Sequence, residues 1–326
     1  MKRSSPKWSS SFIDTTEIMQ YFRARKYKWI LCFSLFCAVM VFSTMRAQRS
    51  FEAAEVIHSY GSFADARAMS LTLDGIIVIV DAGNEAVIEM AASGEILRML
   101  SGRGWGNLEF DQPADVDAVQ PLRIFIADYG NNRIQIFDKN LNYVSTITGT
   151  YPDPASPIFR YPRSLAVSRH NDIFILDGDN ARIIKMNATG ALTATFGGFD
   201  AGMGRLLHPI RVRASLTDVL AVVDGNDLIF FDLYGNFLSR YHNTEKISSC
   251  SFDVSTSQWI CASDSSVTIL RLDGTEWHEQ QTIVLPVPEY NQQHDHVIID
   301  CVYRNNRIYI LTAHQVIIFD LHPPKE

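Results

Sequence analysis

The stretch ADYGNNRIQIFD, residues 127–138, decides the fold because near-copies of it recur along the chain. An apolar run ends on Asp128, a Tyr-Gly-Asn-Asn turn follows, and Arg133 begins a second β-rich run. Two short β-rich runs around a polar turn are typical of a β-hairpin. The same pattern is repeated as GIIVIVDAGNEAVIEM (75–90), DIFILDGDNARIIKM (172–186) and VLAVVDGNDLIFF (219–231), and more weakly as QWICASDSSVTIL (258–270) and RIYILTAHQVIIF (307–319).

The repeat has a regular period. The first run of each copy closes on one of six residues: Asp81, Asp128, Asp177, Asp224, Ser263 and Thr312. Successive closing residues lie 39–49 positions apart, so six units fill residues 51–326. A period of this length, with four strands expected in each unit, predicts a six-bladed β-propeller rather than a solenoid.

A second motif precedes each of the first four hairpins. It reads FADARAM (63–69), FDQPADV (110–116), FRYPRSL (159–165) and LLHPIRV (206–212), with Pro before the first strand in the last three. Together the motifs resemble those of the NHL-repeat family of β-propellers, best in units two and three and least in units five and six. The resemblance implies a fold more firmly than a function.

The two ends of the repeat region predict how the ring closes. The last unit stops after QVIIFDLHPPKE (315–326), which supplies only its third strand, whereas EAAEVIHSYGS (52–62) is a strand without a unit. A closed ring leaves no unpaired sheet edge between the first and last units, so we expect this N-terminal strand to complete the last blade. The expected fold is therefore all-β, with six four-stranded antiparallel blades preceded by one N-terminal apolar helix.

The N-terminal segment indicates passage into or across a membrane. Residues 1–28 are basic, and residues 29–45, WILCFSLFCAVMVFSTM, are uncharged and barely long enough to span a bilayer. They predict either a cleaved signal peptide, conventional in length if Met19 is the true start, or an uncleaved membrane anchor. The basic side stays in the cytoplasm, so residues 51–326 are expected outside it, as a periplasmic, secreted or membrane-anchored domain.

Charge excludes one class of partner. Residues 1–50 hold nine of the 29 Lys and Arg and two of the 36 acids, so residues 51–326 carry a net charge of −14. Such a body repels phosphates, and we expect no nucleic-acid partner. We expect a monomer.

Charged residues follow the Pro position in the predicted first strands, which line a propeller's central channel. Arg67, Asp115, Arg163 and Arg211 are expected to ring the channel mouth, with Asp117 and Arg213 one pleat further along. Three arginines around one opening suit an anionic ligand. The favoured alternative is a ring of Arg–Asp pairs that satisfy one another.

The histidines give only a weak indication of a metal. His208, His294 and His296 fall on predicted loops of the same face, and His294-Asp295-His296 has a chelating spacing. Amidating lyases that share this fold hold zinc with channel histidines, but units two and three supply none here. Lactonase-type propellers hold a channel calcium, which the neighbouring arginines would oppose. We therefore expect no metal and no cofactor.

Cysteines and exposed aromatic residues leave alternatives open. Cys250 and Cys261 flank a predicted hairpin turn and either pair or pack as small apolar residues. Trp105, Tyr129 and Tyr161 fall on predicted loops, where they serve a contact surface or pack between blades.

The sequence favours a binding module. We expect a protein, peptide or glycan to be engaged by the loop face around the channel. The alternatives are an enzyme acting in the channel, of the amidating-lyase or lactone-hydrolase kind, and a structural module of a cell-envelope assembly. The opening stretch itself is interpreted as a hairpin corner, in which Asp128 accepts hydrogen bonds from the turn amides and Arg133 reaches a carboxylate or carbonyl.

Overall fold

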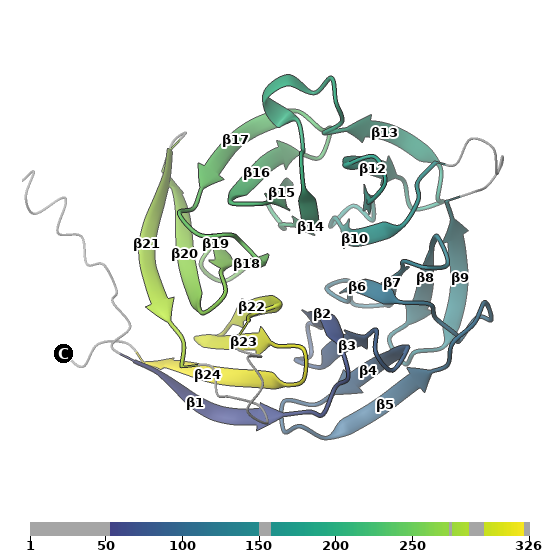
Figure 1. Ribbon diagram of the computed structural model, residues 1–326, viewed down its shortest axis with the longest axis horizontal. Coiled ribbons are helices and arrows are strands. Elements are labelled where there is room, and N and C mark those ends of the chain that lie inside the picture. Colours follow the sequence, from purple (N-terminus) through teal and green to yellow (C-terminus); the bar gives the residue numbers. More distant parts are fainter. Residues whose placement is uncertain (1–52, 150–157, 274–275, 287–296, 323–326) are drawn as a thin grey trace, which may run out of the picture. The chain divides into compact units, whose positions relative to one another are not determined.

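The computed structural model describes residues 53–149, 158–273, 276–286 and 297–322, and these form six four-stranded antiparallel sheets. The sheets are arranged as the blades of a ring, with the first strand of each nearest the centre (Figure 1). The predicted six-bladed β-propeller is therefore confirmed. Within the described ranges the helical structure is a single 3₁₀ turn at Gly202–Gly204.

The blades follow one another along the chain. Blade 1 contains β2 (Ala66–Leu71), β3 (Ile77–Asp81), β4 (Ala86–Met90) and β5 (Ile96–Ser101). Blade 2 contains β6 (Pro113–Asp117), β7 (Arg123–Asp128), β8 (Arg133–Asp138) and β9 (Tyr143–Thr148). Blade 3 contains β10 (Pro162–Val167), β11 (Ile173–Asp177), β12 (Arg182–Met186) and β13 (Leu192–Phe196).

The other three blades have the same order of strands. Blade 4 contains β14 (Pro209–Ala214), β15 (Val219–Asp224), β16 (Asp227–Asp232) and β17 (Phe237–His242). Blade 5 contains β18 (Ser249–Asp253), β19 (Gln258–Ala262), β20 (Ser266–Asp273) and β21 (Glu276–Val284). Blade 6 contains β22 (Asp300–Arg304), β23 (Arg307–Leu311) and β24 (Val316–His322), and its outer strand is β1 (Ala53–Tyr60).

The N-terminal strand closes the ring as predicted. β1 pairs antiparallel with β24, so Val56 lies opposite Phe319 and Tyr60 opposite Val316. The first described strand of the chain thus completes the last blade (Figure 1).

Burial on both faces explains why the second strand of each blade is an unbroken apolar run. In β3, Ile77 and Ile79 pack in the cluster shared with blade 6, whereas Val78 and Val80 pack in the cluster shared with blade 2. Successive side chains of a strand point to opposite faces, so alternate residues fill the two neighbouring interfaces. A strand between two blades has no solvent face, and its sequence shows no polar alternation.

The closing aspartate of a blade fastens the loop that precedes that blade. The buried carboxylate of Asp128 accepts a hydrogen bond from the amide of Asp111 (2.8 Å) and another from Arg133 Nε (2.7 Å). Arg133 also donates to the carbonyls of Trp105 and Glu109. The expected corner is present, but the backbone amide bound by Asp128 belongs to the loop before β6 instead of to its own turn.

Left-handed backbone explains the asparagines of the repeat. Asn132, at the end of the turn between β7 and β8, has φ 52°. Asn305 and Asn306, with φ 53° and 61°, join β22 to β23. Asn adopts this region more easily than most residues, so Asn-Asn before Arg is turn chemistry wherever it occurs.

The predicted N-terminal helix lies outside the described residues. Over the described part of the chain, no helix is long and apolar enough to cross a membrane. The assignment of residues 29–45 to a signal peptide or an anchor remains a prediction.

Candidate functional site

The inner strands place six side chains at one level of the central channel. Each pairs with the residue just before the closing position of its blade, so the register defines the set: Ala68, Asp115, Ser164, Arg211, Ser249 and Asp300. One pleat further along lie Ser70, Asp117, Ala166, Arg213, Ser251 and Val302. Charged residues thus enter the channel from blades 2, 4 and 6.

Four of these residues form an ion cluster across the channel, here called the channel plug: Asp115, Arg211, Arg213 and Asp300. Arg211 Nη1 lies 3.2 Å from Asp115 Oδ1 and 3.0 Å from Asp300 Oδ2. Arg213 Nη1 lies 2.8 Å from Asp115 Oδ2, and its Nη2 lies 3.1 Å from Asp300 Oδ2. Arg211 Nη2 also donates to the carbonyl of Arg67 in blade 1 (3.1 Å). Blade 4 is thereby fastened to blades 1, 2 and 6.

The plug is electrostatically self-contained. Both carboxylates are fully buried, and they balance the two guanidiniums. Burial opposes the ionisation of Asp115, but Arg213 and Arg211 outweigh it and hold the pKa of that carboxyl below its usual value. Burial likewise opposes the charge of Arg213, but Asp115 and Asp300 raise its pKa. Asp115 and Arg213 therefore stay charged at neutral pH.

Channel-facing carboxylates also join neighbouring inner strands. Asp115 accepts from the amide of Leu165 (3.1 Å), and Asp117 accepts from that of Val167 (2.9 Å). Asp300 accepts from the amide of Met69 (3.0 Å), which links blade 6 to blade 1. Each inner strand is the edge of its sheet, so the amides that face away from its own sheet need partners of this kind.

Of the four residues predicted at the channel mouth, the structure places two in the plug and two on the exposed surface. Asp115 and Arg211 meet in the plug. Arg67 is exposed and pairs with Asp65, and Arg163 is exposed on β10. Sequence reasoning missed Asp300, because unit six lacks the Pro motif. Its distance to the closing residue Thr312 was a usable signal, since it is one residue shorter than the distance from Asp115 to Asp128.

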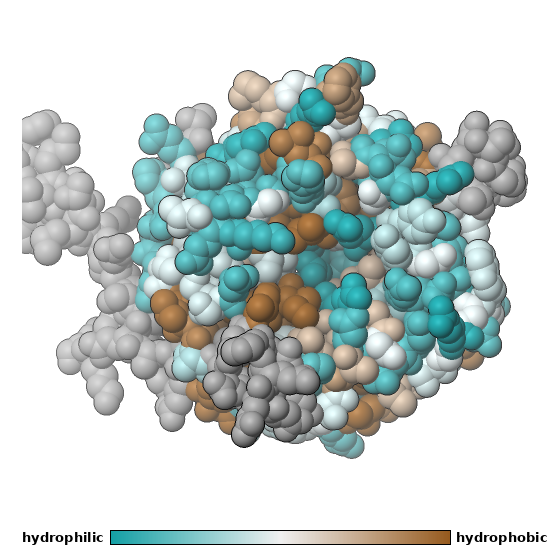
Figure 2. Space-filling model, viewed as in Figure 1, coloured by the Kyte–Doolittle hydropathy of each residue, from teal (hydrophilic) through white to brown (hydrophobic). Residues whose placement is uncertain are grey.

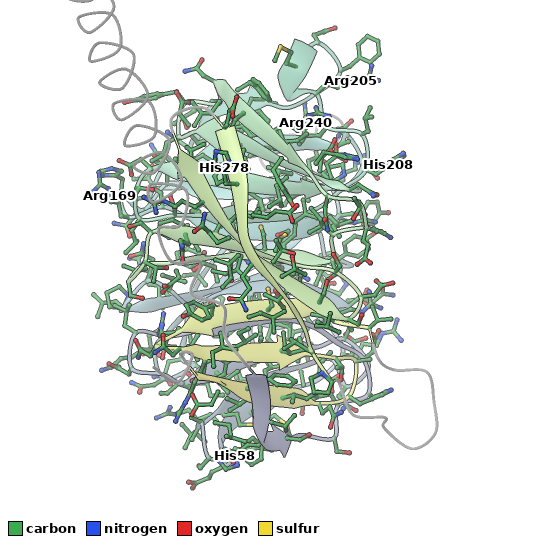
Figure 3. The ribbon with its side chains drawn as sticks, turned by 90° about the vertical axis from the view of Figure 1, so that its left-hand side faces the viewer. His58, Arg169, Arg205, His208, Arg240 and His278 are labelled. Carbon is green, nitrogen blue, oxygen red and sulfur yellow. The ribbon has the colours of Figure 1, made fainter. Side chains whose placement is uncertain are left out.

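A cavity of about 380 Å³ occupies the channel beyond the plug. It is lined by the second halves of inner strands and by the turns that follow them in blades 1, 2, 4, 5 and 6. We call this side of the ring the turn face. It is opposite to the face that carries the Pro loops, on which we expected the site. Figure 3 shows Arg169, in a turn-face loop, and His208, in a Pro loop, on opposite sides of the ring.

The plug sits at the inner end of the cavity, and polar side chains surround it. Arg213 belongs to both the plug and the cavity lining. Asp117, Ser70 and Ser251 line the cavity beside it. Burial raises the pKa of Asp117, although the amides of Val167 and Val119 donate to it. We call these four residues the cavity floor.

The cavity wall and rim are mainly apolar. Val119, Leu216 and Val302 lie along the wall, and the exposed Leu73 and Val254 stand at the rim. Two charged groups complete the wall. Arg304 donates to the carbonyls of Leu71 and Thr72, and Asp253 accepts from Ser255 and Thr256. Burial lowers the pKa of Arg304.

The Pro-loop face is largely hydrophilic. This is the face seen in Figure 2, where hydrophilic residues predominate and brown patches are scattered. Trp105 is 70% exposed in a loop of this face, whereas the rings of Tyr129 and Tyr161 pack on one another between blades 2 and 3, 5.2 Å apart. Trp105 is thus the most exposed of the three aromatic residues, while Tyr161 is 38% exposed.

Of the three histidines singled out as weak metal candidates, the described part of the chain includes one. His208 is exposed on the Pro-loop face, and His294 and His296 lie outside the described residues. In the described ranges no group of three or more His, Cys, Asp and Glu is placed to hold a metal ion.

The cysteines are buried thiols. Cys250 and Cys261 lie directly opposite each other on β18 and β19, and both are free, as is Cys301. Burial raises the pKa of the Cys250 and Cys261 thiols to about 12, so neither is a nucleophile at neutral pH.

Comparison with known proteins confirms the repeat and the fold. Residues 110–137 match the NHL repeat. Solved structures with a similar fold include a streptogramin B lyase, with a TM-score of 0.57, 12% identity, and coverage of 81% of this chain and 97% of the lyase. A catalytically inactive virginiamycin B lyase from Staphylococcus aureus with quinupristin has a TM-score of 0.55 and 10% identity, covering 83% and 99%. A chain of the mitotic checkpoint complex has a TM-score of 0.56 and 12% identity, covering 84% and 94%.

None of the curated proteins matches the chain. At 10–12% identity the solved structures share the fold alone with it. The chain is a six-bladed β-propeller with an NHL repeat.

Proposed function

We propose that the propeller is a binding module whose site is the cavity at the centre of the turn face. The observation that carries this proposal is a cavity of about 380 Å³ with apolar walls and a polar inner end. Small-molecule sites are commonly concave, mostly apolar and supplied with a few polar groups that orient the ligand. This volume lies within their usual range of roughly 300–1,000 Å³.

The plug supports this proposal by making the site rigid. Ion pairs fasten blade 4 to blades 2 and 6, and Arg213 is at once a member of the plug and a floor residue. A ligand then meets side chains that are already held in place, which lowers the entropic cost of binding.

We place this module outside the cytoplasm, exported or tethered by residues 29–45. The support is the uncharged segment itself and the basic residues before it. Protease treatment of intact cells tests the location. Digestion of the propeller in intact or outer-membrane-permeabilised cells agrees with export, and protection until the cytoplasmic membrane is broken contradicts it.

Partner binding on the Pro-loop face is a second candidate, favoured by the exposed Trp105. Tryptophan is enriched among the residues that dominate protein interfaces. A Trp105→Ala variant that loses a co-purifying protein, peptide or glycan while keeping its thermal stability would support this candidate.

A pair of leucine variants tests the cavity. Leu216→Trp fills part of the cavity from the wall, and Leu122→Trp makes the same change in another turn of this face, at a residue that is 70% exposed and outside the lining. A fragment library is screened by thermal shift against wild type and both variants. We expect fragments that stabilise wild type and Leu122→Trp but not Leu216→Trp. A library without such fragments overturns the cavity as the site.

A further inference from the structure

We infer that the cavity takes an uncharged amphipathic small molecule, whose hydrogen-bond-accepting head lies on the cavity floor and whose apolar body follows the wall. This inference rests on the proposed function and names the ligand class. Three features of the cavity carry it: the balance of charges, the free donors at the floor and the apolar wall.

The charges around the cavity are already engaged. Arg213 is held by Asp115 and Asp300, and Arg304 by two backbone carbonyls. Asp253 is bound by the hydroxyls and amides of its own turn, and Asp117 by two backbone amides.

The cavity therefore repels a ligand of either charge. An anion is repelled by Asp117 and Asp253, and a cation is repelled by Arg213 and Arg304. Bringing a further charge into a partly desolvated site without a free partner costs free energy. The cavity is thus built for a molecule without net charge.

Three residues of the floor have hydrogen-bond donors that are not used by a strong acceptor. Ser70 Oγ accepts from the amide of Ala118 and keeps its own hydrogen to donate. Ser251 Oγ is buried, at 8% exposure for the residue, and has no hydrogen-bonding nitrogen or oxygen among the described residues; its neighbour is the Cys301 thiol, a weak partner. Arg213 uses Nη1 and Nη2 in the plug, which leaves Nε.

These donors define the head group. A buried donor without an acceptor destabilises the empty cavity, so an acceptor that reaches the floor relieves that cost. A carbonyl or ether oxygen supplies such an acceptor without bringing a charge. An amide, ester or ketone head fits the floor.

The wall defines the body. Val302 lies at the level of the floor, and Val119 and Leu216 line the cavity beyond it. Leu73 stands at the rim in the turn that follows β2, whereas Ser70 of the floor lies within β2. A linear chain of about eight carbons supplies an apolar body for the test.

Three compounds with the same eight-carbon chain test the preference for an uncharged head group. They are octanamide, octanoate and octylamine, each titrated by calorimetry into the purified propeller at neutral pH. We expect octanamide to bind at least about tenfold more tightly than either ion, because every group of opposite charge in the cavity is already engaged and each ion also meets a group of its own sign. Leu216→Trp should weaken octanamide binding by about tenfold or more, and Leu122→Trp should leave it unchanged.

A serine variant tests the head group. Ser251→Ala removes one floor donor and should weaken octanamide about fivefold, corresponding to the usual net worth of one hydrogen bond. The melting temperature of this variant verifies that the fold is intact.

The outcomes separate the ligand class from the proposed function. Tighter binding of octanoate or octylamine that Leu216→Trp abolishes overturns the uncharged class and leaves the cavity as a site. Absence of binding by all three compounds also overturns the class, and the fragment screen then decides the function. Octanamide binding that ignores Leu216→Trp and Ser251→Ala overturns the inference as well.

Discussion

Blades 1–4 and blades 5–6 differ in how the second strand is joined to the segment that precedes the blade. In blades 1–4 the second strand ends on an aspartate whose carboxylate binds amides of the loop before the blade, as Asp81 binds Ala64 and Asp65. The inner strands of these four blades all contain a register shift near their start. The pairings of β18 with β19 and of β22 with β23 have none.

The difference teaches that the aspartate and the irregular register belong together. In blade 5 the amide of Ser248 donates to the backbone carbonyl of Ala262, and in blade 6 that of Ile299 donates to Leu311. In blades 5 and 6 the backbone ladder itself therefore joins the residue before the first strand to the second strand, without a carboxylate.

The channel plug joins the two groups of blades. Its arginines come from blade 4, and its carboxylates come from blade 2 and blade 6. Breaking the plug should therefore affect the whole ring, whereas breaking one closing residue should affect one blade.

The largest effect is expected for Asp115→Ala. It leaves two buried guanidiniums with a single carboxylate, so the free energy of unfolding should fall by about 3–5 kcal/mol. Urea unfolding followed by circular dichroism measures it. Asp65→Ala is the matched control, because it breaks an exposed ion pair with Arg67 and should cost about 0–1 kcal/mol. Equal losses in the two variants would show that the plug does not stabilise the ring.

A smaller loss is expected for Asp81→Ala in blade 1. Its carboxylate accepts from the amides of Ala64, Asp65 and Gly83, and no arginine takes part. Removing an ionised acceptor of this kind should lower the free energy of unfolding by about 1.5–3 kcal/mol. Hydrogen exchange should speed up at the amides of Ala64 and Asp65 first. Uniform acceleration around the ring would contradict a local role.

Ser263→Ala, at the equivalent position of blade 5, should have a smaller effect. The hydroxyl of Ser263 accepts one hydrogen bond from Asn243 Nδ2 (2.9 Å). One neutral hydrogen bond is worth about 0.5–1.5 kcal/mol. Thermal unfolding of Ser263→Ala beside Asp81→Ala gives the contrast, and a loss in Ser263→Ala as large as that in Asp81→Ala would remove the distinction between the two groups of blades.

The last prediction concerns the slope of stability with pH. The pKa of Asp115 is lowered from 3.8, so the stability it contributes is complete above that value and is lost as the pH falls through its folded pKa. Burial raises the pKa of Asp128, so the folded state binds this proton first and stability is gained as the pH falls through the raised value.

Two asparagine variants separate these slopes. Urea unfolding of wild type, Asp115→Asn and Asp128→Asn from about pH 6 to about pH 2.5 measures them. The wild-type advantage over Asp115→Asn should shrink toward the acid end, whereas wild type should improve relative to Asp128→Asn. Slopes of the same sign would contradict the opposite shifts.

The repeat made most of the fold predictable. Closing residues such as Asp81 and Asp128 recur every 39–49 residues, and they set the number of blades. The strand left over at residues 52–62 indicated how the ring closes. These signals are local, because each depends on hairpin chemistry within one unit.

The candidate site was predicted only in part, because it depends on contacts across the ring. Asp115 and Arg211 were singled out, but their meeting with Asp300 required the register of blade 6, where the motifs fade. The cavity was missed because rim residues such as Leu73 and Val254 follow no motif and differ between blades. The pairing of charges from different blades depends on the closed ring, and no single repeat unit contains the information for it.

The pairing of β1 with β24 has a consequence for synthesis. Val316 is made roughly 260 residues after Tyr60, its partner, which at usual ribosomal rates takes about 13–50 s. The strands of the other five blades are contiguous in the chain, so all of them are made before β24, whereas β1 has no partner until then. β1 is therefore made before the other described strands but pairs last. Loss of β24 would also leave β1 without its partner.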